Sequence, residues 1–379
     1  MDTTTAAGWA LYLAPIGIVE FGEPGVIADA NLYSRLLLGA SVDTIFGHLS
    51  GNRSAPAERT NGSGGYWGDN FTIASTPWGS LRVRVHPLLE GGPTPAKTWY
   101  ACSDDLADDH PFWRRFYEAC DRARIWREYA SSYDKVLLSL DYYRSCVDRH
   151  VRALIAHGCK NVVDIGGGTG NVAIPVAEAG RIVTVVDPGR AMLDQLRSKI
   201  SIEVAGRVRI FEQPAEDVCH CAPAKVDGVS ILMALFDMAD PLKAFQQAMQ
   251  VLVPGGMIIV TEPCQTFSMA NLLAHVEADL RDHLDFARLK ADWQQVRAVN
   301  QLLDPQSRRG ERVWAERAYE LLTRAGFREV TLTPSHYGEC ATVSGVKSSA
   351  QGEEQWSRSC RFGLDRQRTT VGGKLPEMA

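Results

Sequence analysis

The fold of this chain is limited above all by a glycine-rich turn that directly follows a short apolar run. Residues 162–165 are Val-Val-Asp-Ile, and glycines follow at positions 166, 167, 168 and 170. The apolar run predicts a buried strand, and the apolar residues from Val172 onward predict the start of a helix. Glycine lets a backbone approach a ligand closely, and a helix N-terminus offers unpaired N–H groups. The stretch therefore predicts a strand–turn–helix unit that cradles a ligand.

The spacing of the glycines separates two kinds of cofactor site. A dinucleotide pattern G-x-G-x-x-G beginning at Gly166 requires glycine at position 171, where Asn171 stands. The series Asp164, Gly166, Gly168 and Gly170 resembles motif I of the class I S-adenosylmethionine (SAM) methyltransferases. The resemblance implies that the turn faces the amino-acid end of SAM; the alternative is a loop that only turns the chain.

A segment ahead of the turn extends the resemblance. Residues 126–134 are similar to the Tyr-Asp-x-x-Ala-x-x-Tyr-Asp segment of many small-molecule methyltransferases: Ala130, Tyr133 and Asp134 match, whereas Trp126 and Arg127 replace the first pair. The resemblance implies that Tyr133 lies over the SAM site. The alternative is a core-facing aromatic residue on an amphipathic helix.

Downstream positions carry the adenosine half of the implied site. A second predicted strand, 182–186, ends in Asp187, which is 21 residues after Gly166 (187 − 166). An acid at that strand end can accept hydrogen bonds from both ribose hydroxyls, although it can also cap a helix. In relatives resembling this chain, the residue at the position of Met192 packs against adenine.

The adenine contacts depart from the family pattern after a third predicted strand, 208–211. Pro214 stands where relatives often have Asp, which leaves the Ala215 N–H as the implied contact and Glu216 or Gln213 as substitutes. After a fourth strand, residues 234–241 resemble the family's Ala-Leu-His-His-Leu-x-Asp-Pro segment, which places Ala234 at the cofactor.

The remaining elements complete a fold of the α/β class. A fifth strand, 257–261, ends at Glu262, and 330–337 and 341–346 resemble the antiparallel pair that closes the family's sheet. We therefore expect a Rossmann-like class I methyltransferase sheet that is mostly parallel. The domain spans 111–348, and a helical insertion at 264–305 forms a cap over the substrate.

The two ends of the chain are less informative. The sequence of residues 1–110 predicts an α+β extension, with a helix in 31–46, an irregular loop at 47–68 and a hairpin at 71–85. We expect this extension to be a substrate cap or a dimerisation element that does not bind SAM, which makes a homodimer one expected form. Residues 349–379 predict a polar tail.

Three residues near the strand ends are candidates for catalysis. Asp237 replaces a family histidine, Glu262 ends the fifth strand, and His275 lies in the insertion. Each can take a proton from an acceptor or stabilise developing positive charge. The alternatives are that Asp237 caps the helix at Pro241, that Glu262 holds an arginine and that His275 is on a solvated helix face.

Composition limits the compartment and the partners. The 379 residues have a formal net charge of −5, which gives no overall basic surface for nucleic acid. No run of about 18 apolar residues predicts a membrane span. The nine cysteines form no framework, so we expect a reducing cytoplasm. We expect no metal site, because Cys219-His220-Cys221 has no second ligand cluster and reads as a surface loop.

The implied function is methyl transfer from SAM to a small-molecule acceptor in biosynthesis, such as a secondary metabolite or a lipid-like intermediate. Two alternatives belong to other classes. An NAD-dependent Rossmann oxidoreductase is compatible with Asp187 but not with the glycine spacing. A SAM-binding module without transferase activity fits all of the motifs, because a fold does not specify a reaction.

Overall fold

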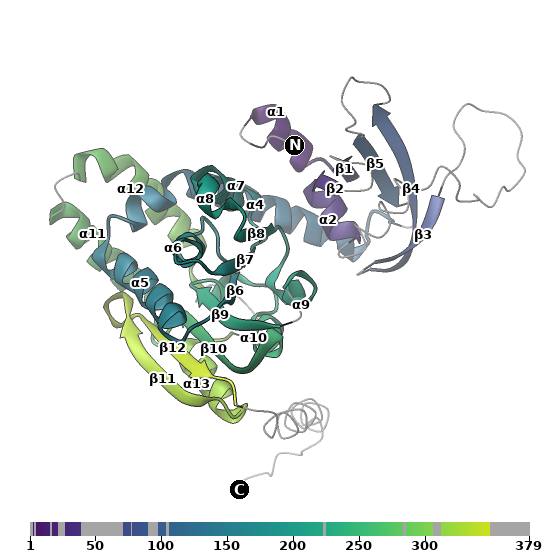
Figure 1. The fold of residues 1–379 in the computed structure, drawn as a ribbon. Helices are drawn as coiled ribbons and strands as arrows, with labels where there is room; N and C mark the ends of the chain where they lie inside the picture. Colours follow the sequence, from purple (N-terminus) through teal and green to yellow (C-terminus); the bar gives the residue numbers. More distant parts are fainter. Residues whose placement is uncertain are drawn as a thin grey trace, which may run out of the picture. The chain divides into compact units, whose positions relative to one another are not determined.

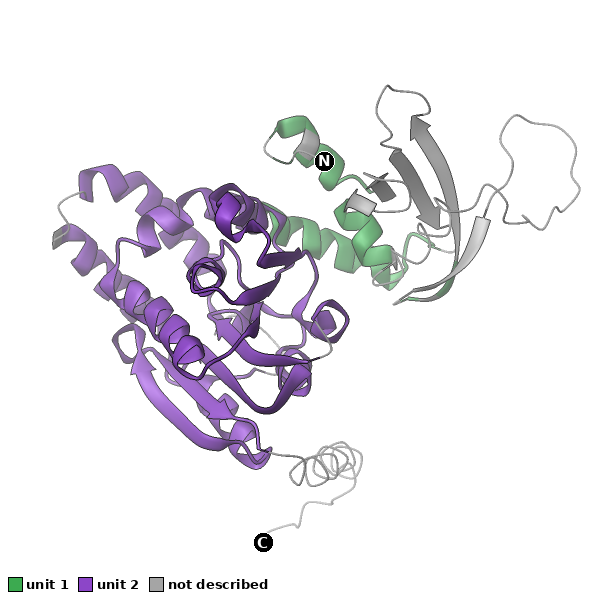
Figure 2. Cartoon of the chain, viewed as in Figure 1, with its two compact units in different colours: residues 1–124 green, residues 125–379 purple. Residues whose placement is uncertain are grey.

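The computed structural model forms two compact units, residues 1–124 and 125–379 (Figure 2). The predicted loop at 47–68 and the predicted tail at 349–379 lie outside the residues that the structure describes. Those residues are 3, 5–15, 17–21, 27–38, 71–76, 78–89, 98–103, 106–222, 225–282, 286–305 and 312–348.

The first unit is built on an antiparallel sheet with the strand order β2-β1-β5-β4-β3. The predicted hairpin is confirmed, because β3 and β4 pair from Phe71↔Arg84 to Thr76↔Gly79. Of the predicted helix at 31–46, the described part is α2. The elements are α1 Ala6–Tyr12, β1 Gly17–Phe21, β2 Ile27–Ala30, α2 Leu32–Leu38, β3 Phe71–Thr76, β4 Gly79–Leu89 and β5 Thr98–Ser103.

Helix α4 (Pro111–Leu137) crosses the boundary between the units, which falls between Arg124 and Ile125. Its first turns belong to the aromatic core of the first unit. There the Tyr33 ring lies 5.1 Å from the Phe112 ring and 5.6 Å from the Phe116 ring, in edge-to-face contacts that aromatic pairs favour. Its last turns belong to the second unit and reach the candidate site.

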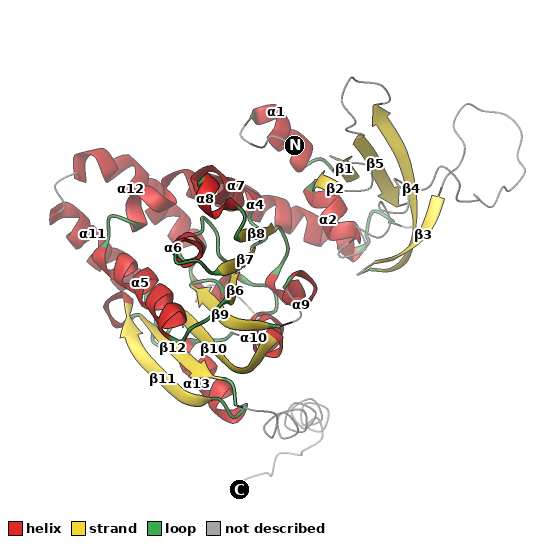
Figure 3. Ribbon diagram, viewed as in Figure 1, coloured by secondary structure: helices red, strands yellow, loops and turns green. Residues whose placement is uncertain are grey.

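The second unit contains the predicted sheet, with the strand order β11-β12-β10-β9-β6-β7-β8 (Figures 1 and 3). Strands β6 to β10 pair in parallel, and β12 runs antiparallel to both β10 and β11, so the predicted closing pair is confirmed. The strands are β6 Asn161–Ile165, β7 Ile182–Val186, β8 Val208–Phe211, β9 Val226–Leu232, β10 Leu252–Pro263, β11 Arg328–Ser335 and β12 Cys340–Val346.

Two apolar cores lie on opposite faces of this sheet, because successive strand residues point to opposite faces. Val162 contributes to the core with α5, α6 and α7, whereas Val163 contributes to the core with α10 and α13. The helices are α5 Asp141–Ala156, α6 Ala173–Glu178, α7 Arg190–Lys199, α8 Ile202–Ala205, α9 Val218–Cys221, α10 Pro241–Val251 and α13 Ala315–Arg324, with 3-10 turns at Ala215–Asp217, Leu235–Asp237 and His336–Gly338.

The insertion consists of two helices, α11 (Met269–Asp282) and α12 (Phe286–Leu302). Their buried side chains, among them Val276, Leu280 and Val296, join the same core as the last turns of α4 and the helix α5. None of the helices in the described part of the chain is long and apolar enough to cross a membrane.

Candidate functional site

The glycine turn after β6 has the backbone that its sequence predicts. Gly166, Gly168 and Gly170 have φ values of 67°, 50° and 80°, which only glycine adopts without strain. A Cβ at Gly166 would lie 2.3 Å from the Cβ of Ala234, and one at Gly170 would lie 2.2 Å from Leu196 Cδ1. The turn is thus packed against both the loop after β9 and the helix α7.

Asp187 lies at the end of β7 and holds this turn. Its two carboxylate oxygens accept hydrogen bonds from the backbone N–H groups of Gly168 (2.9 Å) and Gly189 (2.6 Å). Burial raises the pKa of Asp187 to about 6, although both N–H groups act to lower it. Each oxygen has a second lone pair, so the carboxylate can still accept hydrogen bonds from two hydroxyl groups.

Asp164 and Met192 flank the turn from either side. Asp164 is buried in β6, and its Oδ2 atom has no hydrogen-bond partner among the described residues. Burial raises the pKa of Asp164 to about 7. A Cβ at Gly168 would lie 3.2 Å from Met192 Cε, so the thioether covers the turn. An acidic side chain beside Gly167 and an apolar side chain beside Gly168 therefore border the same turn.

Two of the residues expected around adenine lie in one buried turn, and one of them makes a structural contact. Ala215 and Glu216 are both buried in the 3-10 turn that follows β8. The Glu216 carboxylate accepts the N–H of Asp240 at 2.8 Å, which ties it to the start of α10. Beside them, Arg190 and Glu212 form a buried ion pair at 2.6 Å, which the sequence did not reveal.

Glu262 contacts backbone rather than an arginine. Its carboxylate accepts three successive N–H groups, from Ala234 and Leu235 at 2.8 Å and from Phe236 at 3.3 Å. Burial raises the pKa of Glu262 to about 8, against the opposing effect of these donors. The loop before this turn includes Met233 with a φ of 52°. Glu262 thus fixes the loop that carries Ala234 and Asp237.

Asp237 follows in the same loop and accepts a hydrogen bond from the indole N–H of Trp126 at 3.2 Å. It lies close enough to Asp187 to act on its titration. The alternative that Asp237 caps the following helix is wrong. Asp240 is the N-cap residue of α10, and its carboxylate accepts the N–H of Lys243 at 2.9 Å.

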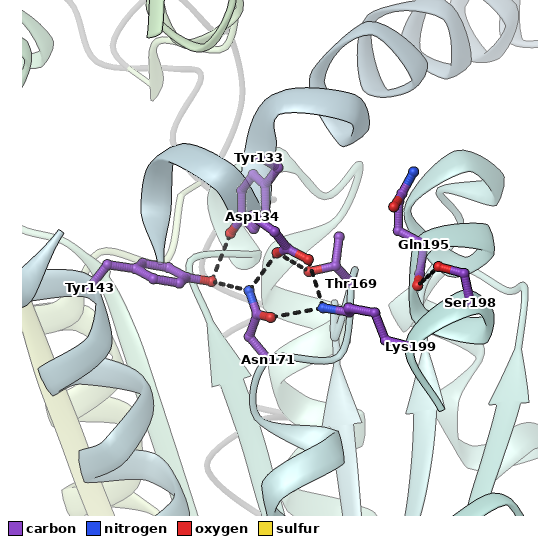
Figure 4. A network of polar contacts seen from close by, with 8 residues as sticks. All are labelled: Tyr133, Asp134, Tyr143, Thr169, Asn171, Gln195, Ser198 and Lys199. Atoms are coloured by element: carbon purple, nitrogen blue, oxygen red, sulfur yellow. Dashed lines mark hydrogen bonds and ion pairs between the residues drawn. The ribbon is translucent and has the colours of Figure 1, made fainter. Parts of the chain in front are cut away.

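A polar network links Tyr133 and Asp134 of α4 to the glycine turn (Figure 4). The Asp134 carboxylate accepts hydrogen bonds from Thr169 (2.7 Å), Asn171 (2.9 Å) and Lys199 (2.7 Å). The Tyr133 hydroxyl lies 3.1 Å from the hydroxyl of Tyr143, which also accepts from Asn171. Asp134 belongs to a recognisable motif, but its partners were not predictable from sequence, because they lie in elements 35 to 65 residues away.

His275 lies apart from these groups. It is exposed on α11, and its ring stacks on Tyr337 with the centroids 4.9 Å apart. Its catalytic role stays a prediction. The Cys219–Cys221 stretch lies in the helix α9, not in the expected surface loop. Over the described part of the chain, no three His, Cys, Asp or Glu side chains are grouped so as to hold a metal ion.

Comparison with known proteins agrees with this geometry. Residues 163–260 match the family model described as a methyltransferase domain. Over 141 residues the chain is 31% identical to the ubiquinone/menaquinone biosynthesis C-methyltransferase UbiE of Rubrivivax gelatinosus, covering 37% of this chain and 54% of that protein. It is 32% identical over 98 residues to the tRNA 5-carboxymethoxyuridine methyltransferase of Escherichia coli, covering 26% of this chain and 38% of that protein.

Among solved structures, the magnesium protoporphyrin IX methyltransferase of Synechocystis with bound SAH aligns with a TM-score of 0.38 and 17% identity, over 55% of this chain and 84% of that one. The curated relatives are matched over about half of their length or less. The matched region covers the glycine turn and Asp187 and ends two residues before Glu262. The second unit therefore contains a region, residues 163–260, that matches a methyltransferase domain.

Proposed function

We propose that this protein transfers the methyl group of SAM to a small-molecule acceptor. One observation carries the proposal above all: the glycine turn and Asp187 form a single hydrogen-bonded unit, with positive φ at three glycines and spare acceptor capacity on the carboxylate. The Oδ2 atom of buried Asp164, which has no hydrogen-bond partner within the described ranges, and the Met192 side chain over the turn also suit a polar cofactor with an apolar base. Every residue assigned to the cofactor belongs to the second unit.

The bound cofactor supplies an activated methyl group and its own leaving group, so the protein mainly positions the acceptor. In this chain Asp187 holds the turn, and Glu262 holds the loop after β9 through three N–H groups. We infer that Asp237 is the group that takes a proton from the acceptor or faces its developing charge. The Trp126 indole orients the Asp237 carboxylate. In this proposal Glu262 positions the loop, because its oxygens already accept backbone donors.

The proposed class of acceptor rests on the aromatic residues that α4 carries next to Trp126, the hydrogen-bond partner of Asp237. Trp126, Tyr129 and Tyr133 form a row of aromatic rings on α4, with neighbouring centroids 5.4 Å and 5.0 Å apart. The apolar faces of α11 and α12 pack into the same core. Aromatic and apolar walls with few polar groups suit a small organic molecule. A net charge of −5 gives no general attraction for nucleic acid.

Ligand binding and turnover test these two statements separately. Thermal unfolding should shift upward with SAM and with S-adenosylhomocysteine (SAH), and not with NAD, because ligands stabilise the state that binds them. A shift with NAD alone would favour the oxidoreductase. Incubation with SAM and a panel of phenols, quinols and amines should release SAH with at least one of them. Tight, strongly salt-dependent RNA binding would contradict a small-molecule acceptor.

The remaining expectations concern assembly and compartment. We infer a cytoplasmic setting, because the cysteines of the described residues, among them Cys146, Cys264 and Cys340, are free thiols. A homodimer remains our proposal for the assembly. Light scattering on the purified full-length protein measures its mass directly, and a monomer at micromolar concentration would contradict the proposal.

A further inference from the structure

The last turns of α4 carry polar contacts on two opposite sides. On one side, the Asp134 carboxylate accepts hydrogen bonds from Thr169 and Asn171 of the glycine turn and from Lys199 of α7 (Figure 4). Lys199 also donates to the Asn171 side-chain oxygen at 3.0 Å. Thr169 is buried, whereas the side chains of Asp134 and Lys199 are 22% and 30% exposed. One carboxylate thus joins three elements next to the implied cofactor.

The other side of the same turns contacts helix α12 of the insertion. The Ser132 hydroxyl donates to Asp292 at 2.7 Å, and Lys135 forms an ion pair with the same carboxylate at 3.0 Å. One turn earlier, the Tyr129 hydroxyl donates to the Asn300 side chain at 2.9 Å. Residues two apart on an α-helix point about 200° apart. Ser132 and Asp134 therefore bind partners on opposite sides of the same helical turn, α12 on one side and the glycine turn and α7 on the other.

We propose that Asp134 is a positioning residue that couples occupancy of the glycine turn to the order of helix α12. The inference rests on the proposed function, because it takes the turn as the cofactor site and α12 as part of the acceptor roof. In this proposal a ligand that orders the glycine turn also orders Thr169 and Asn171. Because these residues bind Asp134, they hold the last turns of α4 in place, and those turns contact α12. Coupling between two sites is reciprocal, so a bound cofactor would favour the acceptor and a bound acceptor would favour the cofactor by the same factor.

The coupling is tested on the full-length protein with SAH as the probe. Hydrogen exchange of residues 286–302 is measured with and without saturating SAH. In the wild type, SAH should slow exchange in α12, although this helix carries none of the assigned cofactor residues. Asp134→Asn should weaken SAH binding about tenfold, the size of one lost hydrogen bond to a charged group. At saturating SAH this variant should also lose most of the added protection in α12.

Two further variants separate coupling from a loss of folding. Thr169→Val removes one donor to Asp134 from the turn and leaves α4 unchanged, so it should reduce the α12 response in the same way. Asp148→Asn is the matched control, since it breaks an exposed carboxylate–arginine pair on α5 and should behave like the wild type. If Asp134→Asn does not fold, the Thr169→Val variant decides the question.

The outcomes distinguish this inference from the proposed function. SAH binding with a loss of α12 protection in Asp134→Asn or Thr169→Val, and not in Asp148→Asn, supports the coupling. SAH binding that leaves α12 unprotected in the wild type, or equally protected in all variants, overturns the coupling alone. Failure of the folded wild type to bind SAH or SAM overturns the proposed function, and the coupling with it.

Discussion

At the scale of single residues, the acidic side chains of this site are satisfied mainly by backbone N–H groups. Asp187 accepts two of them, Glu262 accepts three, and Glu216 accepts one. Backbone donors cost no side-chain entropy to place, so these carboxylates hold loops firmly. The consequence is a turn whose geometry depends on glycine.

Gly166→Ala should destabilise the protein and abolish cofactor binding. Alanine would have to adopt a φ of +67° at this position, and its Cβ would lie 2.3 Å from the Ala234 Cβ. The cost exceeds about 1 kcal/mol in urea unfolding, since alanine is strained at positive φ. Gly206→Ala is the control, because its φ is −71° and its Cβ would meet nothing within 4 Å. That control should be neutral or stabilising by up to about 1 kcal/mol. Equal effects of the two substitutions would refute this account of the turn.

Asp237→Asn should lower kcat by roughly 10²–10⁴-fold and leave SAM affinity nearly unchanged. The substitution keeps the shape of the side chain and its hydrogen bond from Trp126, and it removes the charge that general base catalysis uses. Glu262→Gln should instead disturb SAM binding and kcat together, since an amide presents a donor to the three N–H groups. Near-normal kcat in Asp237→Asn on the true acceptor would contradict our assignment of the base.

Features that depend on neighbouring residues could be predicted from the sequence, whereas hydrogen bonds between distant residues could not. The position of Asp187 at the end of β7 was predictable because the apolar run before it and its distance from the glycines are local properties. The partners of Asp134 and Glu262 were not, since Lys199 and the 234–236 N–H groups approach them only after the sheet has formed. A motif match identified Asp134 as a residue of interest but could not give its contacts.

At the scale of elements, the strand order and the helices between the strands follow from local patterns. Short runs of mainly apolar residues such as 162–165 predict strands buried on both faces, and the structure confirms this strand. The start of α10 differs from one alternative that the sequence left open. Asp237 was weighed as the cap of α10, whereas the backbone takes another three residues before the helix begins, so Asp240 is the N-cap.

Asp240→Ala should lower the free energy of unfolding by about 0.5–2 kcal/mol, the usual cost of losing an N-cap. Its carboxylate accepts the Lys243 N–H, which otherwise has no helical partner. Asp237→Ala is the comparison, and it should not affect the stability of α10. Urea denaturation followed by circular dichroism measures both. A larger loss in Asp237→Ala than in Asp240→Ala would restore the capping assignment that the structure rejects.

At the scale of the whole molecule, buried ionisable groups set how stability depends on pH. Burial raises the pKa values of Asp164, Asp187 and Glu262 to about 7, 6 and 8, from 3.8, 3.8 and 4.5. Burial lowers the pKa values of His150 and His336 to about 3 and 4, from 6.5. The carboxyl groups favour the folded state when protonated, and the imidazoles favour it when neutral.

The free energy of unfolding without ligand should therefore fall as pH rises from about 6.5 to 8, because in this range buried carboxyl groups bind more protons in the folded state while the histidines are largely neutral in both states. The carboxyl groups stabilise the folded state fully at pH below their pKa values in the unfolded chain. This stabilisation is lost as pH rises through their pKa values in the folded state, about 6 to 8. The histidine contribution is lost as pH falls below 6.5. Each group adds a slope of at most about 1.4 kcal/mol per pH unit. Urea unfolding from pH 5 to 9 measures this profile, and Asp164→Asn should flatten its alkaline side. Stability that rises from pH 7 to 9 would disprove the assignment.

The central claim is that the glycine turn and Asp187 form a SAM site, and calorimetric titration of the full-length protein with SAM tests it most directly. We predict saturable binding of one SAM per chain. Asp187→Ala should weaken it by about 1.5–3 kcal/mol, the range for hydrogen bonds to a charged group. A folded wild type that binds neither SAM nor SAH, or a folded Asp187→Ala variant with unchanged SAM affinity, would contradict the account.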